Sequence, residues 1–77
     1  MVIIGIDAHK RSHTLVVCDE QGRELARRTT GTSSRDHLGL VTWAGRFGKE
    51  RTWAVEDCRH LSRRLERDLL GAGERIR

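Results

Sequence analysis

The stretch Met1-Val-Ile-Ile-Gly-Ile-Asp-Ala-His-Lys10 decides the fold of this 77-residue chain. Its apolar residues are interrupted only by Gly5, and they run directly into one acid, Asp7. Such a run, without polar alternation, is typical of a strand in the buried middle of a sheet that helices cover. Carrying a carboxylate to the tip of this strand costs desolvation free energy unless a cation or hydrogen bonds compensate. Asp7 therefore belongs either to a metal or phosphate site or to a turn that ends the strand.

The composition indicates one small basic domain. A chain of 77 residues buries roughly 60% of its unfolded surface by size scaling. Lys and Arg outnumber Asp and Glu by 15 to 11, which favours a polyanionic partner. Nucleic acid is favoured over membrane, because no basic amphipathic helix with a bulky aromatic face is present. Since the sequence shows neither a membrane-spanning run nor a signal peptide, we expect a cytoplasmic protein without a membrane partner.

The residues that follow predict an antiparallel meander of three strands. Residues 14–18 form a second apolar, β-branched run, and the polar residues 19–22 with Gly22 suit a hairpin. Residues 23–30 are polar enough to lie at a sheet edge, where their arginines discourage edge-to-edge pairing.

A helix is expected after the meander. Ser33 and Asp36 form a variant of the capping box, and Gly48 is a suitable stop. The apolar stripe that we expect to lie on the sheet consists of Leu38, Leu40, Val41, Trp43, Ala44 and Phe47.

The next strand, residues 52–55, repeats the opening theme, because an apolar run again delivers an acid, Glu56. A helix separates it from the meander, so it should return parallel to the first strand by a right-handed crossover. Neighbouring parallel strands lie about 4.8 Å apart. Asp7 and Glu56 could therefore reach one divalent ion between them.

A second helix is predicted over residues 57–70, with a buried ridge made of Leu61, Leu65, Leu69 and Leu70. Arg59, Arg63 and Arg67 recur every four residues on another face, with Arg64 beside them. This face is either a phosphate-contacting stripe or an ordinary solvated helix face. Residues 74–77 then resemble the first residues of another strand.

Two motifs carry a resemblance to a known family. Gly5-Ile-Asp-Ala-His-Lys10 and Trp53-Ala-Val-Glu-Asp-Cys-Arg-His-Leu61 resemble the amino-terminal region of the DEDD transposases of bacterial insertion sequences. That group includes the Piv/MooV DNA invertases, and its catalytic domain is similar to the Holliday-junction resolvase. The likeness extends through Gly71-Ala-Gly-Glu-Arg75, so it covers essentially the whole chain. The element order fits the first two thirds of an α/β ribonuclease H-like fold. Residues 1–77 are therefore expected to form a partial domain, cut off before its carboxyl-terminal third.

The resemblance implies the roles of several residues. Asp7 corresponds to the first D of the DEDD set and Glu56 to its E. In the family, these acids and two later aspartates hold Mg²⁺ or Mn²⁺ for phosphodiester cleavage and strand transfer on DNA. Lys10 contacts a phosphate or is simply an exposed turn residue, and Asp57 is expected to cap the following helix. A guide RNA is a further partner that the full-length family admits. Because the later acids are missing, we expect a truncated and inactive transposase.

Two other classes remain open at this point. A non-catalytic nucleic-acid-binding or interaction module agrees with the net charge and the arginine face. A fragment of an actin-like or sugar-kinase ATPase has the same meander, but residues 8–10 lack the glycines of its phosphate loop. In every case, an unpaired sheet edge next to the strand at residues 52–55 would favour a homo-oligomer.

Overall fold

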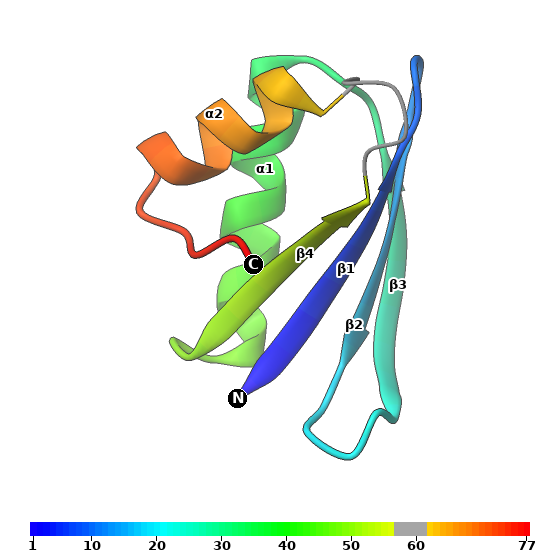
Figure 1. Cartoon of the computed structure of the whole chain (residues 1–77), viewed down its shortest axis with the longest axis vertical. Helices are drawn as coiled ribbons and strands as arrows, with labels where there is room; N and C mark the ends of the chain where they lie inside the picture. The colour runs from blue at the N-terminus through cyan, green and yellow to red at the C-terminus, as the bar shows by residue number, and fades with distance from the viewer. Residues whose placement is uncertain (57–61) are drawn as a thin grey trace.

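The computed structural model describes residues 1–56 and 62–77. One twisted sheet carries both helices on the same face, as Figure 1 shows. The elements follow the order β1 (Val2–Ala8), β2 (His13–Cys18), β3 (Glu24–Thr30), α1 (Ser34–Ala44), the 3-10 turn η1 (Gly45–Phe47), β4 (Arg51–Glu56) and α2 (Arg63–Gly71). This order confirms the predicted succession of meander, helix, strand and helix.

The sheet has the strand order β3-β2-β1-β4, so the opening strand lies between two neighbours. β1 pairs antiparallel with β2 and parallel with β4, and β2 pairs antiparallel with β3. The parallel pair requires a crossover connection, which β2, β3 and α1 supply together. Both the central place of β1 and the parallel return of β4 are confirmed.

The turn between β2 and β3 is built around Asp19. Its Oδ1 atom accepts hydrogen bonds from the backbone N–H groups of Gln21 and Arg23 at 3.0 and 2.9 Å. These bonds, with that from Arg23 the largest cause, lower the pKa of the Asp19 carboxyl. Gly22 has a φ of 84°, a conformation that glycine adopts without strain. The predicted hairpin is confirmed, and β3 begins at Glu24.

Helix α1 begins with the predicted capping box. The Ser33 side chain accepts from the Asp36 backbone N–H at 3.1 Å, and the Asp36 carboxylate accepts from the Ser33 backbone at 3.2 Å. The α-helix ends at Ala44 and continues as one 3-10 turn. Gly48 has a φ of 103° and turns the chain towards β4, as its predicted role as a stop requires.

The core lies between the helices and the sheet. Its fully buried apolar side chains are Ile4, Leu15, Val17, Leu40, Ala44, Trp53, Leu65 and Leu69. Leu38 and Leu70, which the periodicity placed in the buried stripes, are 55% and 59% exposed, so that prediction is wrong for both. Helix α1 instead turns the face that carries His37 towards the core. Leu38 is the next residue along the helix, so its side chain points about 100° away from that face.

The other face of the sheet is open within the part of the chain that the structure describes. Ile3 and Gly5 on this face are half-buried and Asp7 is exposed, whereas Ile4 and Ile6 on the helix face are buried. Within residues 1–56 and 62–77 the helices cover only one face of β1, because α1 and α2 pack on the same side (Figure 1).

Helix α2 falls in the later part of the predicted helical range. It runs from Arg63 to Gly71 after a buried Ser62, and Leu65 and Leu69 form its predicted buried ridge. The beginning of the predicted range, with Leu61 and the expected cap Asp57, lies outside the described residues. Neither α1 nor α2 is long and apolar enough to cross a membrane.

The predicted beginning of a fifth strand is present beside β4. Ile76 forms a parallel bridge with Trp53. The Trp53 N–H donates to the Arg75 carbonyl, and the Arg77 N–H donates to the Trp53 carbonyl, both at 2.9 Å. The outer edge of β4, expected to be free for self-association, is thus partly paired within the chain itself.

Candidate functional site

The candidate site is built on the register between β1 and β4. In this parallel pair Asp7 lies directly opposite Glu56. Both residues are exposed on the open face, at the carboxyl ends of their strands. The two predicted site acids are therefore neighbours across one strand spacing, which is about 4.8 Å. Two carboxylates so placed repel one another unless a cation or a proton lies between them.

A shallow hollow of about 610 Å³ lies beside the two acids. Gly5, Val16 and Ala54 line it with small or apolar surface, and Asp7 and Glu56 contribute its carboxylates. A Cβ atom at Gly5 would lie 3.9 Å from the Val16 carbonyl oxygen, which is ordinary contact. Gly5 therefore leaves the hollow deeper, and no crowding of the backbone demands glycine there.

The structure places three residues at this site that sequence reasoning missed. Thr14 is the β2 partner of Asp7, and Arg27 of β3 reaches the same hollow. His9 Nε2 lies 3.6 Å from the Asp7 carboxylate, with both side chains more than half exposed. The antiparallel register of the meander could have identified Thr14. The position of His9 depends on the turn after β1, which periodicity does not specify.

The donor set suits a hard divalent cation in kind. Carboxylate oxygens are the ligands that Mg²⁺ and Mn²⁺ prefer, and this exposed pair leaves room for the waters that Mg²⁺ retains. Within residues 1–56 and 62–77, however, no group of three or more His, Cys, Asp or Glu side chains is close enough to hold a metal ion. The described residues thus provide a pair of ligands and no complete cage.

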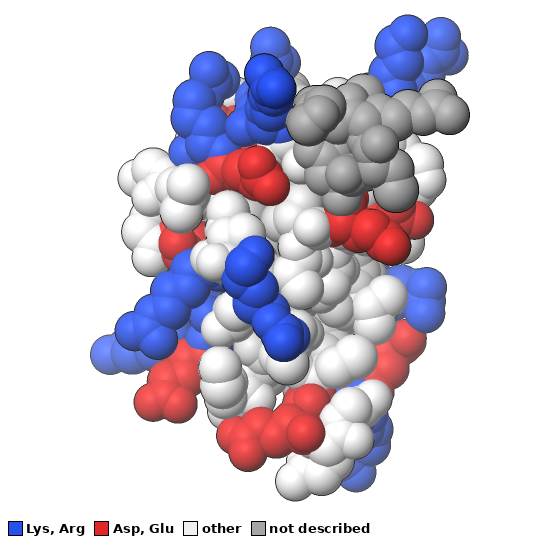
Figure 2. Space-filling model, in the orientation of Figure 1, with Lys and Arg blue, Asp and Glu red and all other residues white. Residues whose placement is uncertain are grey.

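Three of the four predicted basic contacts lie in the part of the chain that the structure describes, and all three are exposed. Lys10, in the turn after β1, is exposed, and so are Arg63 and Arg67 on α2. Arg67 Nε lies 4.0 Å from Asp68 Oδ1, which partly neutralises its charge. Figure 2 shows Lys and Arg side chains gathered over the end where α2 begins, with acids mixed among basic residues further down. Arg59 lies outside the described residues.

Comparisons with known proteins agree with this arrangement. Residues 4–73 match the family model DEDD_Tnp_IS110, described as a transposase. No curated protein matches the chain. Among solved structures, the chain is similar to Thermus thermophilus RuvC in complex with a Holliday junction substrate, with 21% identity and a TM-score of 0.66. A second Thermus thermophilus RuvC structure gives 22% identity and a TM-score of 0.64.

These likenesses cover 99% of this chain but only 62% and 61% of the two RuvC chains. The chain therefore spans less than two thirds of their length. Ethanolamine utilization protein EutJ from Carboxydothermus hydrogenoformans is also similar, with 18% identity, a TM-score of 0.51, and 99% of this chain against 35% of that chain covered. The RuvC likeness confirms the predicted ribonuclease H-like fold.

Proposed function

Because the chain belongs to the DEDD transposase family, which confirms the resemblance carried by its two motifs, we propose that it takes part in DNA transposition or recombination. In this proposal Asp7 and Glu56 are the first two acids of a site for divalent-metal-dependent phosphodiester cleavage and strand transfer. The observation that carries the proposal is the register that sets Asp7 opposite Glu56 on the open face of the sheet.

Asp7 and Glu56 would hold Mg²⁺ or Mn²⁺ through their carboxylates. When bound, such an ion stabilises the charge that develops on the attacking and leaving oxygens of a phosphodiester. The protein would hold the two carboxylates on adjacent strands, so that little conformational entropy is lost when the ion binds. The open face beside them leaves a path for a DNA strand.

We further propose that residues 1–77 are part of a larger domain and do not cleave DNA alone. The support is chemical, because residues 1–56 and 62–77 offer one carboxylate pair where the family uses four acids. The uncovered sheet face and the share of RuvC that the chain spans point the same way. A guide RNA and self-association through a sheet edge remain predictions.

The exposed basic residues would position the DNA backbone. Lys10, Arg63 and Arg67 are exposed. Lys10 follows β1, and α2 begins near the carboxyl end of β4, on the face of the sheet that the helices cover (Figure 1). Contacts to phosphates fix the orientation of a duplex and carry no sequence information. Arg59 is proposed for the same role from its spacing alone.

The metal site is tested by titrating the 77-residue chain with Mn²⁺ and recording amide NMR spectra. The paramagnetic ion should broaden the amides of residues 5–8 and 54–56 first. The double variant Asp7→Asn, Glu56→Gln should abolish this selective broadening. Its matched control is Glu20→Gln, Glu50→Gln, which changes two exposed acids away from the hollow and should leave the broadening unchanged. Unaltered broadening in the Asp7, Glu56 variant would eliminate the site.

A binding module that contacts DNA without cutting it is the second candidate, supported by the exposed arginines of α2. Fluorescence anisotropy with a labelled duplex at several salt concentrations tests it. Changing Arg63 and Arg67 to Gln should weaken binding and reduce the slope of log affinity against log salt by about 2. Arg46→Gln, Lys49→Gln is the control, because these residues lie at the opposite end of β4. An equal reduction in both double variants would mean that only net charge matters.

A further inference from the structure

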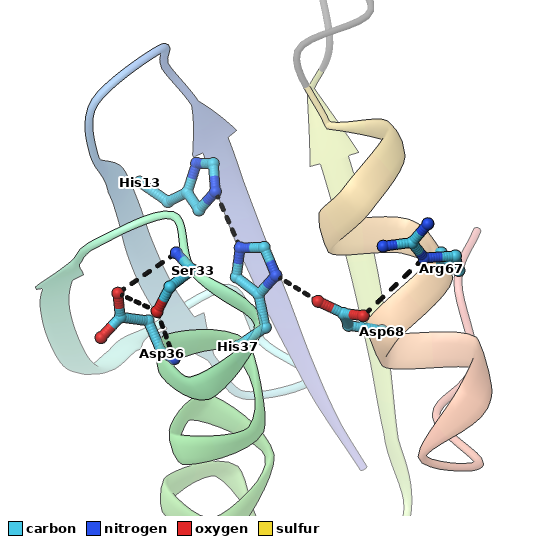
Figure 3. A network of polar contacts seen from close by, with 6 residues as sticks. All are labelled: His13, Ser33, Asp36, His37, Arg67 and Asp68. Carbon is cyan, nitrogen blue, oxygen red and sulfur yellow. Dashed lines mark hydrogen bonds and ion pairs between the residues drawn. The ribbon is translucent and has the colours of Figure 1, made fainter.

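Two histidines and one carboxylate form a buried chain of hydrogen bonds between three elements (Figure 3). His13 Nε2 of β2 lies 3.2 Å from His37 Nε2 of α1. His37 Nδ1 lies 2.8 Å from Asp68 Oδ2 of α2. The two imidazole side chains are each 1% exposed, and their rings stack at a centroid distance of 5.3 Å. None of these three residues belongs to the candidate site.

The geometry of these hydrogen bonds assigns the protons on the two imidazole rings. An ionised carboxylate only accepts hydrogen bonds. His37 Nδ1 therefore carries a proton, and its N–H group donates a hydrogen bond to Asp68. His37 Nε2 is then an acceptor when the ring is neutral, and His13 Nε2–H donates to it. The remaining nitrogen, His13 Nδ1, is buried and has no hydrogen-bond partner among residues 1–56 and 62–77. Each of the two hydrogen bonds therefore has one donor and one acceptor when both imidazoles are neutral.

An additional proton finds no suitable position. On His13 Nδ1 it would create a buried N–H group without an acceptor among residues 1–56 and 62–77, which is costly whichever ring carries the positive charge. Between the two Nε2 atoms it would set two N–H groups against each other and break the contact. Burial and the neighbouring charges of His37 and His9 accordingly lower the pKa of His13.

Asp68, at the other end of the hydrogen-bond network, keeps its negative charge. Hydrogen bonds from His37 and then from the Ser34 hydroxyl lower the pKa of Asp68, so this carboxylate stays ionised well below neutral pH. The titratable and charged groups that face the chain are His9 after β1, Asp36 and His37 of α1, and Arg67 and Asp68 of α2.

A shared proton explains the contact between the histidines better than a metal ion does. Within the described ranges 1–56 and 62–77, no third metal-ligating side chain joins His13 and His37. The nearest carboxylate, that of Asp68, already binds the opposite nitrogen of His37. A buried metal ion held by two imidazoles alone would lack the four ligands that a structural zinc site needs.

This hydrogen-bond network lies on the helix face of the sheet, directly behind the candidate site. His13 pairs with Ala8 in the antiparallel register, one residue after Asp7. The side chain of His13 points to the helix face, and that of Asp7 to the open face. We propose that His13, His37 and Asp68 form a proton-sensitive clamp that holds α1 and α2 against the carboxyl end of β1 while His13 Nδ1 is unprotonated and releases them when that atom gains a proton.

The sign of the pH dependence follows from the assignment. Burial lowers the pKa of His13 in the folded protein, so His13 stays neutral there at a pH at which it binds a proton in the unfolded protein, below its ordinary pKa of about 6.5. The clamp's contribution to stability is therefore fully present above pH 6.5 and is lost as the pH falls. If His13 takes up a proton on unfolding, the equilibrium constant for unfolding rises about eightfold between pH 6 and pH 5.

Nitrogen-15 NMR of the histidine rings in the 77-residue chain tests the assignment directly. At pH 5.5, Nδ1 of His37 and Nε2 of His13 should carry protons, and the other two nitrogens should not. The exposed ring of His9 serves as the internal reference. A His13 or His37 ring with both nitrogens protonated in the folded chain at pH 5.5 would overturn the clamp.

Urea unfolding between pH 6 and pH 5 tests its effect on stability. The unmodified protein should show at least the rise of about eightfold that His13 contributes, and the rise in His13→Met should be about eightfold smaller, because this titrating group is removed. Lys49→Gln, an exposed change that removes no imidazole, is the control and should retain the full rise. A change below threefold in the unmodified chain, or equal slopes in the chain and its His13 variant, would contradict the proposal.

Discussion

Glu74 holds the beginning of the fifth strand onto β4, and removing its carboxylate should destabilise the chain strongly. Its two oxygens accept from Arg51 Nε at 2.6 Å and Arg51 Nη2 at 2.8 Å. The indole Nε1–H of Trp53 donates to the same carboxylate at 2.8 Å. The Glu74 and Arg51 side chains are only 7% and 16% exposed. Glu74→Leu would leave a nearly buried guanidinium without its anion and a buried indole N–H without its acceptor.

The expected cost follows from these contacts. Removing one member of a buried charge pair costs about 3–5 kcal/mol. Arg51 keeps its 2.8 Å bond to the Gly48 carbonyl and some contact with water, so the lower end applies. A loss of about 3 kcal/mol is large for a domain of this size, whose total stability is about 4–12 kcal/mol. It corresponds to a decrease in Tm of roughly 12–24 °C.

Urea and thermal unfolding of the chain, Glu74→Leu, Arg51→Met and the double variant would measure this. Replacing both charges leaves no unpaired ion, so the double variant should be more stable than the sum of the single effects predicts, by about 2 kcal/mol. Glu24→Gln is the matched control, because its 2.8 Å ion pair with Arg27 is exposed and should contribute less than about 1 kcal/mol. Additive effects of the two changes within about 0.5 kcal/mol would refute the reasoning.

Three further predictions concern packing, backbone and charge. Leu69→Ala should cost about 2–5 kcal/mol in urea unfolding, whereas Leu70→Ala, at an exposed position, should change stability by less than about 0.5 kcal/mol. Gly48→Ala should cost about 1–3 kcal/mol, because a φ of 103° with a ψ of 172° strains any residue with a Cβ. The Ser33 hydroxyl and backbone N–H lower the pKa of Asp36 below 3.8, so its stabilisation is present above pH 3.8 and lost as the pH falls further. Ser33→Ala should flatten that loss in acid unfolding curves.

The helix faces show where sequence reasoning reached its limit. Apolar spacing placed Leu38 in the buried stripe of α1, but the buried positions are His37, Leu40 and Ala44. What selects this face is the polar contact of His37 with Asp68, 31 residues further along the chain, and with His13, 24 residues before it. Hydrophobic periodicity assigns a histidine to the solvent, so it cannot anticipate a face fixed by a long-range hydrogen bond. The sequence did contain one signal of this face, because His37, Leu40 and Ala44 have the i, i+3, i+7 spacing of one side of a helix.

The geometry of the two acids was predictable for a different reason. Ile4 pairs with Trp53 across β1 and β4, and both side chains are fully buried on the helix face. Asp7 and Glu56 each lie three residues beyond that pair, so strand alternation sends both to the opposite face. A register slip of one residue would turn Trp53 out of the core, which makes the alternative pairing costly. The burial of one tryptophan against one isoleucine therefore fixes the acid pair, whereas no apolar pair of this kind fixes the basic residues around it.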